Sequence, residues 1–198
     1  MTLEKRTLTS PVEVRKAEDK RTVAGYAALF NSEADIGGAF REVIAPGAFS
    51  GTLAGDIRAL VDHDSGRVIG RSTAGTLRLS EDDKGLAVEI DLPDTTDGRD
   101  LAVSLERGDI SGMSFGFRVT KDTWDETGDM PMRTIQAVDL FEVSAVAFPA
   151  YDDTSLALRS LENAKEARKV IADQNARRAE ARIAYRKASS EQKFRKIA

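Results

Sequence analysis

Short segments in which apolar and polar residues alternate recur along the first 150 residues of this 198-residue chain. Alternation with a period of two places successive side chains on opposite faces of a β-strand. Glycine, proline and aspartate separate the segments, and Asp82-Asp83-Lys84-Gly85 predicts the turn of a β-hairpin. So many short strands favour a small β-barrel or a strongly curved sheet. The predicted strands are 22–30, 41–44, 57–61, 76–79, 86–92, 111–119 and 133–148.

Two helices are predicted within this β-rich part. Pro46 opens a short one that Gly55 ends, because proline suits the first turn of a helix and glycine its end. The second helix spans residues 95–107, where Thr96 or Asp97 can cap its first turn.

The composition changes near Thr154, because no proline or glycine follows and Ala, Arg, Lys and Glu dominate. This predicts a long helix or a helical hairpin. Residues 157–198 hold 12 Lys and Arg against 5 Asp and Glu, whereas residues 1–156 hold 17 against 28. The basic tail is either a solvated helix or a segment that binds nucleic acid or an acidic protein surface. We predict a flexible N-terminal segment over 1–21, a β-barrel domain over 22–156 and a helical tail over 157–198.

Composition also limits the chemistry. There is no cysteine, which excludes disulfides, a cysteine nucleophile and thiolate zinc sites. A single histidine with scattered carboxylates gives no metal-ligand spacing, and no phosphate-binding or dinucleotide motif is present. We therefore predict no cofactor and no metal. No apolar run approaches the roughly 20 residues that span a bilayer, and Met1–Ser10 lacks the apolar core of a signal peptide, so we expect neither membrane association nor export.

His63 is the only histidine and the first candidate for acid–base chemistry. It follows the apolar segment 57–61 and lies between Asp62 and Asp64. A histidine at the end of a strand, beside a carboxylate, can be exposed and oriented as a general base. The alternative is an ordinary surface or core histidine.

Ser114 is the candidate nucleophile. It lies between Gly112 and Gly116, and glycine leaves room for a substrate and for donors to an oxyanion. The alternative is a barrel strand whose glycines permit a tight bend.

Glu142 and Ser144 are two residues apart in an apolar segment, so their side chains point to the same face of a strand. Buried polar groups need partners. Glu142 is placed to orient His63, and Ser144 is a second candidate nucleophile. Alternatively, Glu142 pairs with Arg118 or Arg133.

Several stretches over residues 22–153 form a specific combination when they are taken in order. They are VAGYAALF (23–30), EVIAPGAF (42–49), ALVDHD (59–64), GR (70–71), GTLRL (75–79), RGDISGMSFGF (107–117) and LFEVSAVAFPAY (140–151). In this combination the chain resembles the prohead, or capsid maturation, proteases of tailed phages.

The resemblance implies a serine endopeptidase related in fold to the herpesvirus assembly proteases. The expected fold is α+β, a mostly antiparallel closed β-barrel ringed by a few helices. The resemblance assigns His63 as base and Ser114 as nucleophile. Herpesvirus relatives use a second histidine as third member; this chain has none, so we assign that role to Glu142, with Asp139 and Asp62 as alternatives.

The resemblance also implies substrates and a place of action. The expected substrates are the scaffold protein, or the scaffolding segment of the major capsid protein, and the protease itself. Cleavage is expected in the host cytoplasm, inside the assembling phage procapsid. A homodimer is expected by analogy with the herpesvirus relatives, and nucleic acid is not expected as a partner. The alternatives are a non-catalytic capsid-assembly or scaffold protein of the same fold, and a small-molecule esterase.

Overall fold

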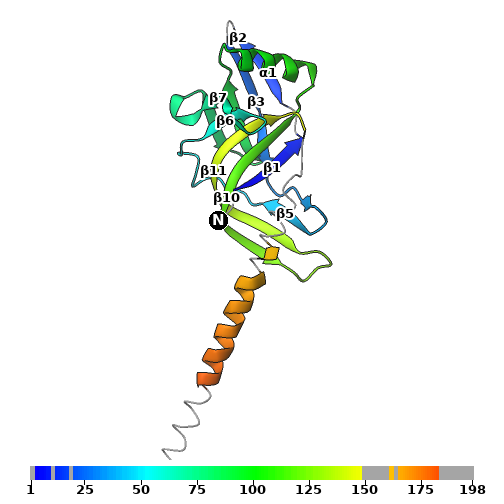
Figure 1. The fold of residues 1–198 in the computed structure, drawn as a ribbon, viewed down its shortest axis with the longest axis vertical. Coiled ribbons are helices and arrows are strands. Elements are labelled where there is room, and N and C mark those ends of the chain that lie inside the picture. Colours follow the sequence, from blue (N-terminus) through cyan, green and yellow to red (C-terminus); the bar gives the residue numbers. More distant parts are fainter. Residues whose placement is uncertain (1–2, 10–11, 18–19, 149–160, 163–164, 183–198) are drawn as a thin grey trace, which may run out of the picture. The chain divides into compact units, whose positions relative to one another are not determined.

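The computed structural model describes residues 3–9, 12–17, 20–148, 161–162 and 165–182. The chain divides into two compact units, Met1–Thr154 and Ser155–Ala198. The first unit contains the strands and the helix α1, and the long β10 and β11 run through it as curved ribbons (Figure 1).

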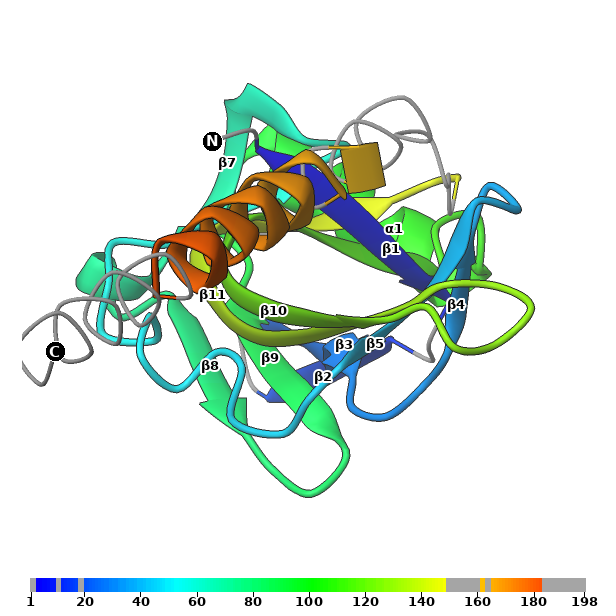
Figure 2. The same cartoon turned by 90° about the horizontal axis from the view of Figure 1, so that it is seen from below.

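Two sheets make up the first unit. The larger has seven strands in the order β1-β10-β11-β5-β4, with β6 attached to β11 and β7 to β6. The smaller has four strands in the order β2-β3-β9-β8. It lies against one side of β10 and β11 (Figure 2). The strands are β1 Glu4–Thr9, β2 Glu13–Ala17, β3 Lys20–Leu29, β4 Ala34–Ile36, β5 Phe40–Ile44, β6 Arg58–Val61, β7 Asp64–Arg71, β8 Leu77–Glu81, β9 Gly85–Asp91, β10 Gly112–Asp125 and β11 Met132–Val146.

The fold is α+β, but the predicted closed barrel is wrong. A barrel closes only when its two edge strands pair, and here β1 and β4 end the main path of the larger sheet. The larger sheet forks instead, because the first part of β11 pairs in parallel with β5 and its last part pairs in parallel with β6. The predicted ring of helices is also wrong: in the described part of this unit, only α1 (Thr96–Arg107) and the 3-10 turn η1 (Ser72–Ala74) are helical.

Helix α1 confirms the prediction for residues 95–107, with a different cap. Thr95 is the N-cap, and its hydroxyl accepts a hydrogen bond from the Gly98 N–H at 3.3 Å, a role that the sequence assigned to Thr96 or Asp97. Gly108 ends the helix in the left-handed conformation, with φ of 80°.

The short helix predicted after Pro46 is absent. The backbone makes successive turns instead, with hydrogen bonds from Ser50 to Gly47 and from Thr52 to Phe49. Gly47 has φ of 87°, and a left-handed residue in the first turn prevents a right-handed helix from propagating.

Strands occupy four regions for which the sequence predicts none. Two of them are β4 and β7, which pair antiparallel with β5 and β6. The segment predicted to be flexible, 1–21, contains β1 and β2, which pair antiparallel with β10 and β3. The polar residues 122–125, which lie between the predicted strands 111–119 and 133–148, belong to β10 and pair with residues 132–135 of β11. In each of these regions a partner strand supplies backbone hydrogen bonds that local apolar patterning does not report.

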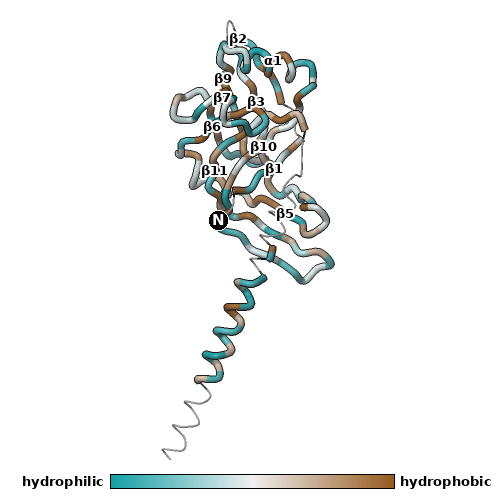
Figure 3. Tube along the Cα trace, in the orientation of Figure 1, coloured by the Kyte–Doolittle hydropathy of each residue, from teal (hydrophilic) through white to brown (hydrophobic). Residues whose placement is uncertain are grey.

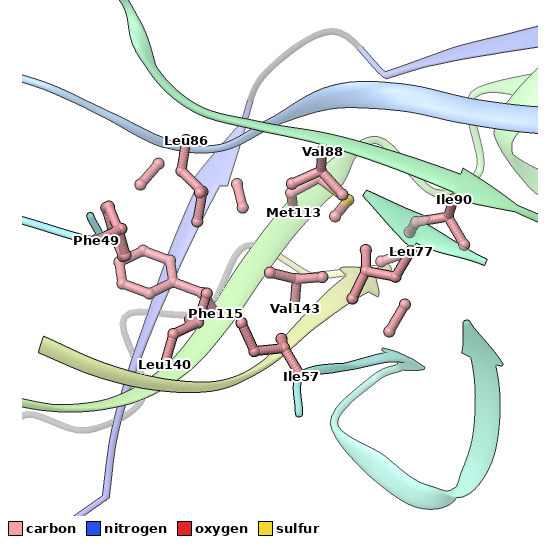
Figure 4. Close-up of a cluster of buried hydrophobic side chains, with 14 of the residues drawn as sticks. Phe49, Ile57, Leu77, Leu86, Val88, Ile90, Met113, Phe115, Leu140 and Val143 are labelled. Carbon is pink, nitrogen blue, oxygen red and sulfur yellow. The ribbon is translucent and has the colours of Figure 1, made fainter. Parts of the chain in front are cut away.

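The core lies between the two sheets (Figure 4). Phe115 packs edge-on against Phe49, with ring centroids 5.5 Å apart, and stacks on Phe117 at 4.8 Å. Each fully buried side chain of this size contributes about 1.5–3 kcal/mol relative to exposure. Burial of Phe115 and Met113 fixes which face of β10 points inward, so the alternate residue Ser114 points to the other face.

In the second unit, residues 165–182 form a helix whose residues are all exposed except Arg168, which is partly buried. Most residues of this helix are hydrophilic (Figure 3). Residues 157–160, 163–164 and 183–198 of the predicted tail lie outside the described residues. Among the described residues, none of the helices combines the length and apolarity that a bilayer crossing requires.

Candidate active site

Strands β10 and β11 place the candidate residues on one face of the larger sheet. Ser114 lies directly opposite Ser144, and Gly116 lies opposite Glu142. The register shifts next to this pair, because Phe117 is paired with Leu140 and the intervening Phe141 is left over as a bulge. The bulge lets Leu140 point into the core while Glu142, only two residues later, points to the opposite face.

His63 reaches the same face from the turn between β6 and β7. Asp62 and His63 both have positive φ, 49° and 59°, and they connect the paired residues Val61 and Asp64 as a two-residue hairpin. Asp62 fixes this turn to β11, because its N–H donates to the Ala145 carbonyl at 2.9 Å and its carboxylate accepts from the Ala147 N–H at 3.0 Å. Asp62 is therefore an anchor of the turn that presents His63.

Glu142 is the carboxylate that contacts the histidine. Its Oε1 lies 2.7 Å from His63 Nδ1, and the two side chains are 12% and 16% exposed. An ionised carboxylate only accepts hydrogen bonds, so Nδ1 carries the hydrogen and Nε2 of the neutral ring is left to accept a proton. Asp139, an alternative in the sequence, is exposed and lies opposite Arg118 in the sheet.

Ser144 holds the other oxygen of this carboxylate. Its hydroxyl donates to Glu142 Oε2 at 2.6 Å, and Ser144 is fully buried. The sequence predicts Ser144 as a second candidate nucleophile and does not predict this orienting contact. The signal was available in the two-residue spacing, which places both side chains on one face.

Ser114 is fully buried beside this chain of hydrogen bonds and is engaged with β1. Its hydroxyl donates to the Arg6 carbonyl at 2.8 Å and accepts from the Thr7 hydroxyl at 3.1 Å. The structure thus brings His63 and Glu142 into contact and places Ser114 one strand away, opposite Ser144. Nothing in the sequence pointed to Arg6 or Thr7.

The glycines around Ser114 have a G-x-S-x-G spacing, but the local structure differs from a nucleophile elbow. An elbow places its serine at a sharp turn between a strand and a helix. Here residues 112–116 lie within the continuous strand β10. Gly116 is required for another reason: a Cβ at this position would overlap Glu142 Oε1 and approach its Cγ and Cδ to 3.1 Å.

A buried network of charges joins β1 to the larger sheet. Arg133, 2% exposed, donates to Glu4 at 2.9 Å, to Glu42 at 3.1 Å and to Asp122 at 2.8 Å. Arg6 also pairs with Glu42, at 2.6 Å. Burial disfavours the charged form of both arginines, but the carboxylates outweigh it, so the pKa of Arg6 and that of Arg133 are raised.

The sequence offered Arg118 or Arg133 as an alternative partner of Glu142, but the structure engages both arginines elsewhere. Arg133 is committed to Glu4, Glu42 and Asp122, and the guanidinium of Arg118 lies 5.2 Å from the centre of the Phe141 ring. The described residues also contain no group of three or more histidines and carboxylates that could hold a metal ion.

An imidazole oriented by a buried carboxylate, next to strand hydroxyls, is an arrangement that acyl-transfer hydrolases use. Residues 10–167 match the family model of the Caudovirus prohead serine protease, and the chain belongs to this family.

Known proteins resemble this chain in sequence and in structure. The prohead protease of Enterobacteria phage HK97 is 34% identical over 136 residues, which are 67% of this chain and 57% of that protein. The chain thus matches little more than half the length of that relative. The bacteriophage T4 capsid assembly protease gp21 matches in structure with a TM-score of 0.50 and 12% identity, over 73% of this chain and 96% of that one; this likeness concerns the fold alone.

Proposed function

We propose that the chain is a serine endopeptidase of phage head maturation. Its substrates are the scaffold protein or the scaffolding segment of the major capsid protein, and the protease itself, inside the assembling procapsid. Family membership supports the reaction class. The observation that carries the assignment of the site is the 2.7 Å hydrogen bond between His63 and Glu142, on the face of the sheet that also bears Ser114.

In this proposal Ser114 is the nucleophile and His63 is the base. The Ser114 hydroxyl turns from the Arg6 carbonyl toward Nε2 of His63, which takes its proton as Oγ bonds to the carbonyl carbon of the substrate. His63 then gives that proton to the leaving amine as the C–N bond breaks. Water, activated by the same imidazole, hydrolyses the acyl-enzyme and restores Ser114.

Glu142 holds His63 in the required tautomer and stabilises the imidazolium that forms. Ser144 and Gly116 determine the position of the Glu142 carboxylate. Ser144 donates a hydrogen bond to one oxygen, and Gly116 leaves room for the other. Both are positioning residues.

Co-expression with the capsid and scaffold proteins tests the proposal. Ser114→Ala and His63→Ala should each abolish cleavage, whereas Ser144→Ala should keep a reduced rate. Ser111→Ala is a matched control, because Ser111 is exposed and lies just before β10. Cleavage that persists in both Ser114→Ala and His63→Ala would refute the site, and loss of all cleavage only in Ser144→Ala would move the nucleophile to Ser144.

A further inference from the structure

Strand β1 lies at the edge of the larger sheet, next to the candidate nucleophile. It pairs antiparallel with β10, and Thr7 lies opposite Ser114 while Arg6 lies opposite Phe115. Within the described part of the larger sheet, β10 is the strand that β1 pairs with. Without β1, β10 would present a free edge, and a free edge accepts an extended peptide through backbone hydrogen bonds.

The backbone of β1 already presents a carbonyl group to the nucleophile. Ser114 Oγ lies 2.8 Å from the carbonyl oxygen of Arg6. A nucleophile must approach the carbonyl carbon of its substrate to about 3–3.5 Å before it reacts. The Arg6–Thr7 peptide bond therefore occupies the place where the bond to be cleaved should lie.

The side chain of Arg6 points to the opposite face of the sheet and is held there by charge. Two of its guanidinium nitrogens donate to the two oxygens of Glu42, at 2.6 and 3.0 Å, and the group lies 5.5 Å from the centre of the Phe117 ring. Planar, bidentate contact with a carboxylate is specific to arginine. Glu42 is 3% exposed, so a neutral or acidic side chain in this place would leave its charge poorly compensated.

The setting of Glu42 fits a lasting recognition group. Arg133 donates to Glu42 at 3.1 Å, which keeps the carboxylate paired and oriented when the Arg6 side chain leaves. A pocket of about 110 Å³ adjoins Arg6 and Glu42 and is lined by Ala28 and Phe115, among others. It leaves space for basic side chains that differ in length or course from Arg6.

We propose that β1 occupies the place of a substrate strand, and that Glu42 selects arginine, or less well lysine, as the residue before the cleaved bond. This inference rests on the proposed function, with Ser114 as nucleophile. It makes β1 a built-in competitor of the substrate, since a tethered strand acts at an effective concentration in the millimolar range. An incoming strand must displace β1 before it can pair with β10.

A peptide series tests the selection on the full chain. Quenched-fluorescent peptides carry the sequence Glu4–Thr9, with Arg6 kept or replaced by Lys, Met or Glu. We expect kcat/KM to fall about tenfold or more from Arg to Met, with Lys between them and Glu uncleaved. Mass spectrometry should place the cut after the arginine. Equal cleavage of all peptides, or a cut at another bond, would overturn the inference.

Two variants separate recognition from folding, and thermal unfolding checks that each is folded. Glu42→Gln should raise KM for the arginine peptide about tenfold and change the methionine peptide less than twofold. Arg6→Met keeps Glu42 but removes the guanidinium that pairs with it, so turnover of the arginine peptide should rise. No rise in a folded Arg6→Met protein would show that β1 does not compete with the substrate.

Ser114→Ala distinguishes failure of this inference from failure of the proposed function. Ser114-dependent cleavage without preference for a basic residue refutes the role of Glu42 but does not refute the proposed protease function. If only co-expressed capsid or scaffold protein is cut, the residue before each mapped cut decides: Arg or Lys supports the inference, and acidic or apolar residues overturn it. No Ser114-dependent cleavage of either substrate overturns both.

Discussion

Substitution of Gly116 by alanine tests the link between the strand geometry and the proposed chemistry. The new Cβ would overlap Glu142 Oε1, and Glu142 Cγ and Cδ would lie 3.1 Å away. These atoms belong to the end of a flexible side chain, so the fold can accommodate the methyl group if the carboxylate moves. A movement of about 1 Å suffices to break the 2.7 Å hydrogen bond to His63.

The magnitude follows from what the carboxylate does. Removing the orienting carboxylate of a catalytic histidine costs on the order of 10⁴-fold in kcat, and a misplacement of about 1 Å costs roughly 100-fold. We expect Gly116→Ala to lower kcat/KM about 100-fold while thermal stability changes little. Gly112→Ala is the matched control on the same strand and face, because its Cβ would instead meet Val146 at 3.1 Å.

A double-mutant cycle makes this reasoning refutable. If Gly116→Ala acts through Glu142, then Glu142→Gln combined with Gly116→Ala should lose no more activity than Glu142→Gln alone. The assay is steady-state cleavage of a peptide substrate, with unfolding curves for each variant. Additive losses, or a Gly116→Ala protein with full activity, would show that the carboxylate position does not control the rate.

Three further outcomes concern stability and its pH dependence. Arg133→Met should reduce the free energy of unfolding by about 3–5 kcal/mol, because buried carboxylates lose the guanidinium that pairs with them. Urea denaturation measures this free energy, and a loss under about 1 kcal/mol would contradict a stabilising role of the network. Thr95→Ala should cost about 1 kcal/mol through loss of the cap on the Gly98 N–H, whereas unchanged unfolding would exclude a capping role. The hydrogen bond from Arg71 lowers the pKa of Asp56 below its ordinary value. The stabilisation of the folded state by this interaction is therefore present above the unfolded-state pKa, near 4, and is lost as the pH falls further. The thermal unfolding midpoint of Asp56→Asn should therefore lie below that of the parent protein at neutral pH, and the two midpoints should converge in acid. A difference between the midpoints that does not change with pH would refute the assignment.

Seven of the strands described above and one helix could be predicted from the sequence because their signals are local. Alternation located β8 and β9, and the glycine-containing turn Asp82–Gly85 joined them. The predicted capped helix over residues 95–107 corresponds to α1. The helix expected after Pro46 failed because the sign of φ at Gly47 depends on the packing of the whole segment.

The candidate site was only partly visible in the sequence. The spacing of Glu142 and Ser144 indicated a shared face, and the lone His63 needed a carboxylate partner. The sequence offered Glu142, Asp139 and Asp62 as partners of His63. Which of them contacts the ring depends on the bulge at Phe141 and on the hairpin turn of β6 and β7.

The sequence by itself therefore determined which residues can do chemistry: one histidine, a serine between glycines, and a glutamate in an apolar strand. Local patterns and residue types suffice for that. Tertiary structure alone decided that the sheets stay open, that Glu142 contacts His63, and that β1 lies beside Ser114. These features arise from pairing between segments that are far apart in the chain, such as Arg6 and Ser114, which are 108 residues apart. Local periodicity carries no information about partners so distant.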